Sequence, residues 1–163
     1  TDPLAAQFSQ PSDIAIAADG SIFITDKNNH KIKKLAVSGG VSTIAGPIGS
    51  VVQGFVNGSG TTARFNYPSG IDIDSNGDLY VADRLNHAIR KVTQAGMVTT
   101  LTGTGLSGDV LGLASIAQFN FPTDVAVSFD GKVYIADRSN HKIKILQGGS
   151  VGLYAGSGTQ GFL

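Results

Sequence analysis

The stretch PSGIDIDSNGDLYVADRLNH, residues 68–87, decides the fold of this chain because its pattern occurs three times. The other copies are PSDIAIAADGSIFITDKNNH, residues 11–30, and PTDVAVSFDGKVYIADRSNH, residues 122–141. They align without gaps, with starts 57 and 54 residues apart, and a phenylalanine lies three residues before each: Phe8, Phe65 and Phe119. Self-similarity at such a period indicates a repeat architecture in which each copy forms one supersecondary unit.

Each unit reads as a set of short β-strands. Apolar residues alternate with polar ones in the first segment, as around Ile71 and Ile73, which is the period of a strand. An Asp-Gly or Asn-Gly pair follows, which favours a two-residue hairpin because its central residues need positive φ. We expect second strands at 22–25, 79–82 and 133–136, third strands around Ile32, Ile89 and Ile143, and fourth strands that end at Gly46, Gly103 and Gly156. Strand-only units with tight turns predict an all-β propeller.

The segment Asp-Arg-Leu-Asn-His at 83–87, with its counterparts at 26–30 and 137–141, resembles the NHL repeat, which is named after its Asn-His-Leu signature. The resemblance implies three four-stranded propeller blades, at about 8–46, 65–103 and 119–156, inside one domain that spans 1–163. The chain departs from the signature where Lys31, Ala88 and Lys142 replace the leucine. Because propellers serve many roles, the resemblance points to a fold rather than to a function.

Three blades are too few for a closed propeller, which has about four to eight. The main prediction is a half-propeller that closes head to tail with a second copy, as a six-bladed homodimer, because its two outer blade faces are too apolar to face water. The alternative is a piece of a longer propeller, trimmed or engineered, that has no function alone.

The composition disfavours several partners. Lys plus Arg equals Asp plus Glu at 12 each, so nucleic acid is a disfavoured partner. No apolar run is long enough to span a bilayer, and the absence of cysteine excludes disulfides and thiolate zinc sites. The charged fraction of 15% favours a secreted or periplasmic setting without deciding localisation. The repeated aromatic residues are interpreted as core between blades and not as a stacking platform: Phe8, Phe65, Tyr67, Phe119 and Phe121.

The loop between the second and third strands carries candidate binding residues. A cation follows the repeated aspartate and a histidine ends the loop, so one face of the propeller gathers Lys27, His30, Arg84, His87, Arg138 and His141. This pattern predicts a surface for an anion or a protein. The competing interpretation is structural, because residues that recur once per blade perform a task of each blade. Asp, Asn and His would then cap one another and the loop backbone inside each blade, through the histidines and Asp26, Asn29, Asp83, Asn86, Asp137 and Asn140.

A channel cation is the main enzymatic alternative. Asp13 and Asp124 occupy equivalent positions near the start of the innermost strand, where the middle unit has Gly70. In a dimer, four such carboxylates would suit Ca²⁺, which takes oxygen ligands. No serine is flanked as a nucleophile elbow requires, and no catalytic residue is assigned. The sequence therefore predicts a binding or scaffold module for a protein or a small ligand, with no required cofactor. The alternative is a hydrolase or lyase that depends on the channel cation.

Overall fold

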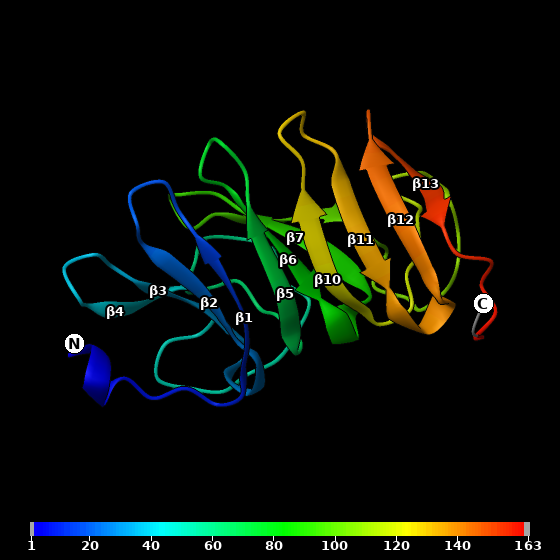
Figure 1. Cartoon of the computed structure of the whole chain (residues 1–163). Coiled ribbons are helices and arrows are strands. Elements are labelled where there is room, and N and C mark those ends of the chain that lie inside the picture. The colour runs from blue at the N-terminus through cyan, green and yellow to red at the C-terminus, as the bar shows by residue number, and fades with distance from the viewer. Residues whose placement is uncertain (1, 162–163) are drawn as a thin grey trace.

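Three antiparallel β-sheets follow one another along the chain in the computed structural model, which describes residues 2–161 (Figure 1). The sheets stand side by side in an arc, and their first strands, β1 (Pro11–Ile16), β5 (Pro68–Ile73) and β10 (Pro122–Val127), are neighbours in space. The two ends of the chain lie at opposite ends of the arc (Figure 1). This architecture confirms the predicted all-β class and its three repeated units, which we call blades 1, 2 and 3.

Each blade is a meander whose strands pair in chain order. Short 3₁₀ turns join the second strand to the third in every blade, and another, η1 (Pro3–Ala5), precedes blade 1. Blade 1 continues with β2 (Ile22–Asp26), η2 (Lys27–Asn29), β3 (Lys31–Leu35) and β4 (Val41–Ala45). Blade 2 continues with β6 (Leu79–Asp83), η3 (Arg84–Asn86), β7 (Ala88–Val92) and β8 (Val98–Thr102). Blade 3 continues with β11 (Val133–Asp137), η4 (Arg138–Asn140), β12 (Lys142–Gln147) and β13 (Ser150–Ala155).

Blade 3 differs from the expected four strands. The connection from blade 2 contributes β9 (Gly112–Leu113), which pairs with β13 and makes this sheet five-stranded. The four-strand prediction is therefore wrong for blade 3. The physical reason is the outer edge of β13, whose unpaired N–H and C=O groups accept a short passing segment of backbone.

The hairpin between the first two strands has three loop residues instead of the predicted two. The N–H of Ala17 donates to the carbonyl oxygen of Ser21 at 2.9 Å, and the N–H of Gly20 donates to that of Ala17 at 2.9 Å. Among residues 18–20, only Gly20 has positive φ, at 84°. A type I turn followed by a left-handed glycine needs positive φ only at the glycine, whereas both types of two-residue hairpin turn need it at the first central residue, here Asp19. Blades 2 and 3 repeat the pattern at 75–77 and 129–131.

The apolar core lies between the blades. One cluster joins blades 1 and 2 around Phe65, and a second joins blades 2 and 3 around Phe119; both rings are completely buried. The other repeated aromatic residues, Phe8, Tyr67 and Phe121, are half-buried. Each blade is thus stabilised by the face of its neighbour rather than by a core of its own.

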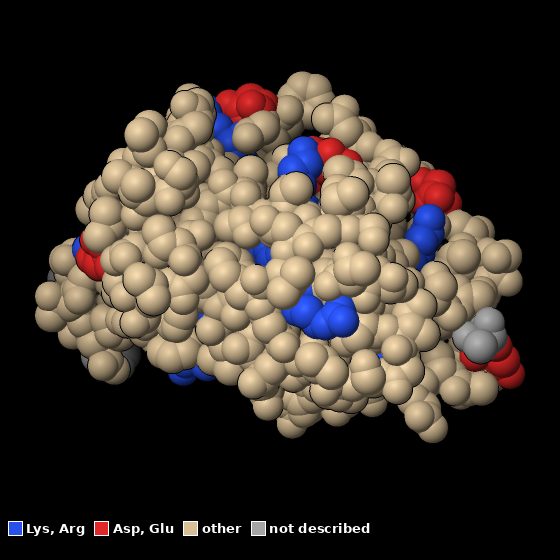
Figure 2. Space-filling view, turned by 180° about the vertical axis from the view of Figure 1, so that it is seen from behind, with Lys and Arg blue, Asp and Glu red and all other residues tan. Residues whose placement is uncertain are grey.

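The side of the molecule that faces away from the viewer in Figure 1 carries few charges. Lys and Arg side chains are scattered there and do not form one patch (Figure 2). Within residues 2–161, no helix combines the length and the apolar character that crossing a membrane requires.

Candidate binding face

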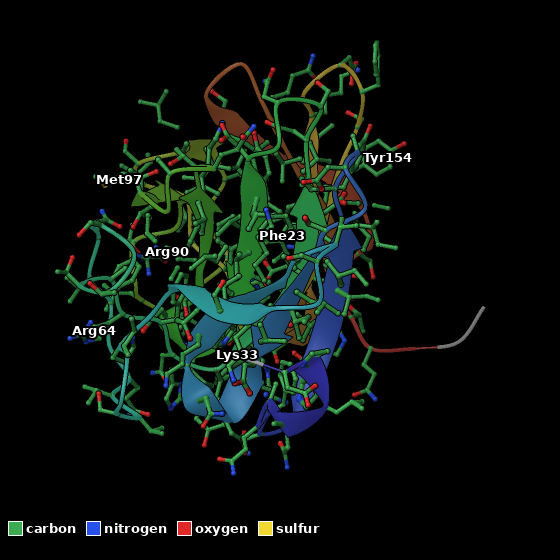
Figure 3. The ribbon with its side chains drawn as sticks, turned by 90° about the vertical axis from the view of Figure 1, so that its left-hand side faces the viewer. Phe23, Lys33, Arg64, Arg90, Met97 and Tyr154 are labelled. Atoms are coloured by element: carbon green, nitrogen blue, oxygen red, sulfur yellow. The ribbon has the colours of Figure 1, made fainter. Side chains whose placement is uncertain are left out.

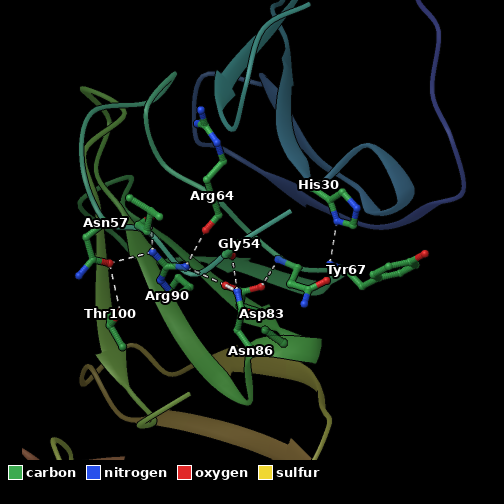
Figure 4. A network of polar contacts seen from close by, with 12 residues as sticks. His30, Gly54, Asn57, Arg64, Tyr67, Asp83, Asn86, Arg90 and Thr100 are labelled. Carbon is green, nitrogen blue, oxygen red and sulfur yellow. Dashed lines mark hydrogen bonds and ion pairs between the residues drawn. The ribbon is translucent and has the colours of Figure 1, made fainter. Parts of the chain in front are cut away.

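The repeated aspartate of each blade is completely buried beneath the loop that follows the second strand. In blade 2, Oδ1 of Asp83 accepts the N–H of Asn66 at 2.7 Å and Oδ2 accepts Nδ2 of Asn86 at 2.8 Å (Figure 4). The same two distances recur in the other blades, between Asp26 and Ser9 or Asn29, and between Asp137 and Asn120 or Asn140. The Asp–Asn pairs therefore fasten the loop to the segment that leads into the same blade.

A buried cation completes this network, and it is absent from the residues singled out in the sequence. Arg90 Nη1 lies 2.7 Å from Asp83 Oδ2, and neither side chain is exposed. Nη1 also donates to the carbonyl oxygen of Arg64 at 3.1 Å, while Nη2 donates to that of Val56 at 2.9 Å and to Asn57 Oδ1 at 2.8 Å (Figure 4). The guanidinium thereby holds the connection between blades 1 and 2 against the sheet of blade 2.

Lysines take the same position in the other two blades. Lys144 Nζ lies 2.8 Å from Asp137 Oδ2, and Lys33 Nζ lies 3.1 Å from Asp26 Oδ2. Each cation follows its aspartate by seven residues and lies over the ring of the repeated phenylalanine, at 4.6 Å from Phe8, 5.2 Å from Phe65 and 5.0 Å from Phe119. A constant charge at this spacing is the signal from which the sequence could have revealed them.

Burial raises the pKa of Asp83 to about 6, and the neighbouring Arg90 acts against that rise. The N–H of Asn66 and the amide of Asn86 also favour the charged carboxylate. All of its close partners are groups of the fold itself, so Asp83 serves structure and is not presented to a ligand.

The histidines join neighbouring blades, which differs from the expected capping inside each blade. Nδ1 of His30 accepts the backbone N–H of Tyr67 at 3.1 Å, and Nδ1 of His87 accepts that of Phe121 at 3.1 Å. Burial lowers the pKa of both imidazoles, and for His87 the charge of Asp137 partly offsets this. His141, in the last blade, is exposed. A local pattern cannot show that the N–H group that donates to a histidine lies in the next repeat.

The loop cations lie at the first positions of the 3₁₀ turns, as the repeat predicts. Lys27 and Arg84 are half-buried and Arg138 is exposed. The guanidinium carbon of Arg84 lies 5.7 Å from the centre of the Phe121 ring in blade 3, so this cation is partly used between blades. Their binding role stays a prediction.

The innermost strands bring Asp13 and Asp124 to one hollow of about 310 Å³, which Gly70 also lines. Oδ1 and Oδ2 of Asp13 accept the N–H groups of Ile14 and Ile71, each at 2.8 Å. Oδ1 of Asp124 accepts the N–H of Val125 at 2.9 Å. Burial raises the pKa of Asp124, and the charges of Asp13 and Asp72 raise it further. Within residues 2–161 no cation pairs with Asp13 or Asp124, so two carboxylates without a counter-ion line this hollow, which we call the axial hollow.

A metal set is incomplete in a single copy. Over the described range, 2–161, no group of three or more histidine or carboxylate side chains is placed to hold a metal ion. Asp13 and Asp124 supply two carboxylates, so the Ca²⁺ site depends on the four carboxylates of a dimer and stays a prediction.

Comparison with known proteins adds the family. The model of the NHL repeat matches residues 8–35, 65–92 and 119–146, more than half of the chain. The chain belongs to the NHL repeat family. Its histidine bridges and buried Asp–cation pairs are therefore features of three consecutive NHL blades.

Relatives of this NHL-repeat chain are longer than it is. NHL repeat-containing protein 2 of Bos taurus is 33% identical over 88% of this chain, which spans 22% of the length of that relative. A solved auxiliary nutrient binding protein from Bacteroides ovatus is 26% identical, with a TM-score of 0.73 over 93% of this chain and 39% of its own. A gluconolactonase from Xanthomonas campestris shares the fold at 16% identity, with a TM-score of 0.67 over 92% of this chain and 48% of its own.

Proposed function

We propose that this NHL-repeat chain is a recognition module that binds a polar ligand at the axial hollow. The observation that carries the proposal is the lining of the hollow, where Asp13 and Asp124 stand beside the small residue Gly70. Hydroxyl side chains complete the lining: Ser12, Ser69 and Thr123. Concave sites with a few convergent polar groups are the usual form of ligand sites.

The chemistry of the lining favours a ligand that offers hydrogen-bond donors. Asp124 uses Oδ1 for the N–H of Val125, and no group of residues 2–161 donates to its Oδ2, which can therefore accept from a ligand. O–H and N–H groups of a polyhydroxylated or amine-bearing molecule, or of a polar protein loop, match such an acceptor. The 26% identity to a nutrient-binding protein supports a small molecule over a protein loop.

The test compares two carboxylate variants in a ligand screen. Monosaccharides, oligosaccharides and free amines form one arm, and polar loop peptides form the other, with binding read by NMR chemical shifts. Asp124→Asn is expected to weaken a ligand that binds at the hollow by about 10-fold or more, because a charged acceptor is lost. Asp130→Asn is the control, since Asp130 lies on the β10–β11 turn and pairs with Lys132 at 2.6 Å. Equal weakening by both variants, or by neither, would refute binding at the hollow.

A channel-cation hydrolase or lyase is the second candidate, and the raised pKa of Asp124 beside Asp13 and Asp72 favours it. A divalent cation would relieve the repulsion among these carboxylates. Titration with CaCl₂ should then raise the melting temperature of the wild-type chain and leave that of Asp124→Asn nearly unchanged. An equal rise in both would exclude a cation held by Asp124.

A further inference from the structure

The two outer faces of the arc expose residues that are buried at the equivalent positions of other blades. Ile14 on β1 is 55% exposed, whereas its counterparts Ile71 and Val125 are 4% and 5% exposed. On the opposite outer face, Ile143 on β12 is 38% exposed, whereas its counterparts Ile32 and Ile89 are completely buried. Ile16, which lies on the same side of β1 as Ile14, is 61% exposed. Figure 3 looks onto the blade 1 end of the arc, where Lys33 is labelled.

The outer faces also carry the two halves of the histidine bridge. Tyr67 and Phe121, which donate their N–H groups to a histidine of the preceding blade, have φ of 54° and 51°. Gln10 has the same conformation, with φ of 51°, at the start of blade 1. His141, at the far end of blade 3, is the histidine in the matching position, and no Nδ1 bond of it is formed within residues 2–161. Gln10 therefore has the backbone conformation in which Tyr67 and Phe121 donate to a histidine of the preceding blade.

Hydroxyl groups of the first strands form a further contact that repeats from blade to blade. Ser12 Oγ donates to the carbonyl oxygen of Ser69 at 2.9 Å, and Ser69 Oγ donates to that of Thr123 at 2.8 Å. Thr123 is the third member, and its hydroxyl would reach the carbonyl oxygen of Ser12 in a blade that follows blade 3. The two outer faces are therefore complementary in three respects: apolar surface, histidine bridge and repeated hydroxyl contact.

We propose that the outer face of blade 3 docks on the outer face of blade 1 of a second copy, and that the reciprocal contact closes a six-bladed ring. We call the contact between two consecutive blades a seam. Each contact between the copies repeats the seams inside the chain, with His141 accepting the N–H of Gln10 of the second copy. The complementary halves belong to one sequence and lie at opposite ends of the arc (Figure 1). This assembly goes beyond the proposed ligand site, which one chain already contains.

The test begins with the mass of the 163-residue chain in solution. Sedimentation equilibrium at micromolar concentration should give twice the chain mass of 16.7 kDa. A stable monomer would overturn the proposal. A dimer must further respond to both outer faces, since Ile16→Asp and Ile143→Lys should each weaken association by about 30-fold or more. Met97→Asp is the control, because Met97 is 45% exposed between β7 and β8 of the middle blade, which forms neither outer face, and its variant should associate like the wild type.

Mixing the variants tests the head-to-tail order. A mixture of Ile16→Asp and Ile143→Lys chains has one intact seam and one seam in which the two introduced charges are opposite, so it should associate more tightly than either variant alone. A dimer in which only one of the two substitutions weakens association, or in which mixing restores nothing, would show a different interface and refute the proposal. Far-UV circular dichroism of each variant separates lost association from lost folding.

Discussion

Nδ1 of His30 in blade 1 accepts the backbone N–H of Tyr67 in blade 2 at 3.1 Å. The two rings also meet edge to face, with centroids 4.9 Å apart. His87 repeats the bond to Phe121 at 3.1 Å, with centroids 4.7 Å apart. The histidine of the NHL signature thus links one blade to the next. Replacing it should weaken the seam between two blades rather than the blade that contains it.

Replacing His30 by alanine should lower the free energy of unfolding by about 1–3 kcal/mol, because the part-buried N–H of Tyr67 loses its acceptor. Urea titration followed by circular dichroism measures the change. The control is His141→Ala, since His141 is exposed. Both changes are made in the Ile16→Asp background so that a second copy does not intervene. Equal losses from the two substitutions would contradict the seam role of His30.

The interblade histidines should make the free energy of unfolding rise with pH below 6.5. Burial lowers the pKa of His30 and His87 from the ordinary 6.5, so below that value the unfolded chain binds more protons than the folded one. Their stabilisation is therefore present above pH 6.5 and is lost as the pH falls. His30→Gln should flatten this rise in the urea midpoint.

Asp83 acts in the opposite direction over part of the same range. Its pKa is raised from 3.8 to about 6, so the folded chain holds the extra proton and stability falls as the pH rises through 6. The difference between wild type and His30→Gln at each pH cancels this contribution. A difference that does not change between pH 5 and 7 would contradict the histidine prediction.

Arg90→Met should destabilise the chain by about 3–5 kcal/mol, because it leaves the completely buried Asp83 without its cation. Arg90→Lys should recover part of the loss, since lysine takes this position in blades 1 and 3, but it lacks the two bonds to Val56 and Asn57. Lys33→Met should cost less, because the side chain of Lys33 is 14% exposed. Thermal unfolding ranks the three, and a Lys33 variant as damaged as Arg90→Met would contradict the ranking.

Gly70→Ala should destabilise the contact between the inner strands of blades 2 and 3. A Cβ at residue 70 would come within 2.5 Å of the Cα of Asp124 and 2.9 Å of the carbonyl oxygen of Thr123, so backbone has to move. Such overpacking costs about 1–3 kcal/mol. Gly40→Ala is the matched control, because nothing lies within 4 Å of its added Cβ. An unchanged melting temperature for Gly70→Ala would show that β5 and β10 can move apart at little cost, and it would contradict the prediction.

The three-fold pattern around residues 11–30, 68–87 and 122–141 was sufficient to predict the all-β class and the repeat, because strand periodicity and turn residues are local properties of the chain, and its resemblance to the NHL signature gave the family. The buried Asp–Asn pairs could be predicted from the sequence for the same reason, since Asp83 and Asn86 are three residues apart. The buried cations could also have been predicted, but only from their constant spacing of seven residues after the repeated aspartate.

The repeat already predicted an aromatic core between blades, but only the tertiary structure decided which polar contacts lie between repeats. It placed His30 against Tyr67, Arg84 over Phe121, and Asp13 and Asp124 on either side of Gly70. It also added β9 to the edge of blade 3. These contacts join residues more than 30 positions apart in the chain or depend on an edge that no local pattern describes. The sequence by itself determined the blades; the seams between them follow from how two sheets face each other in space.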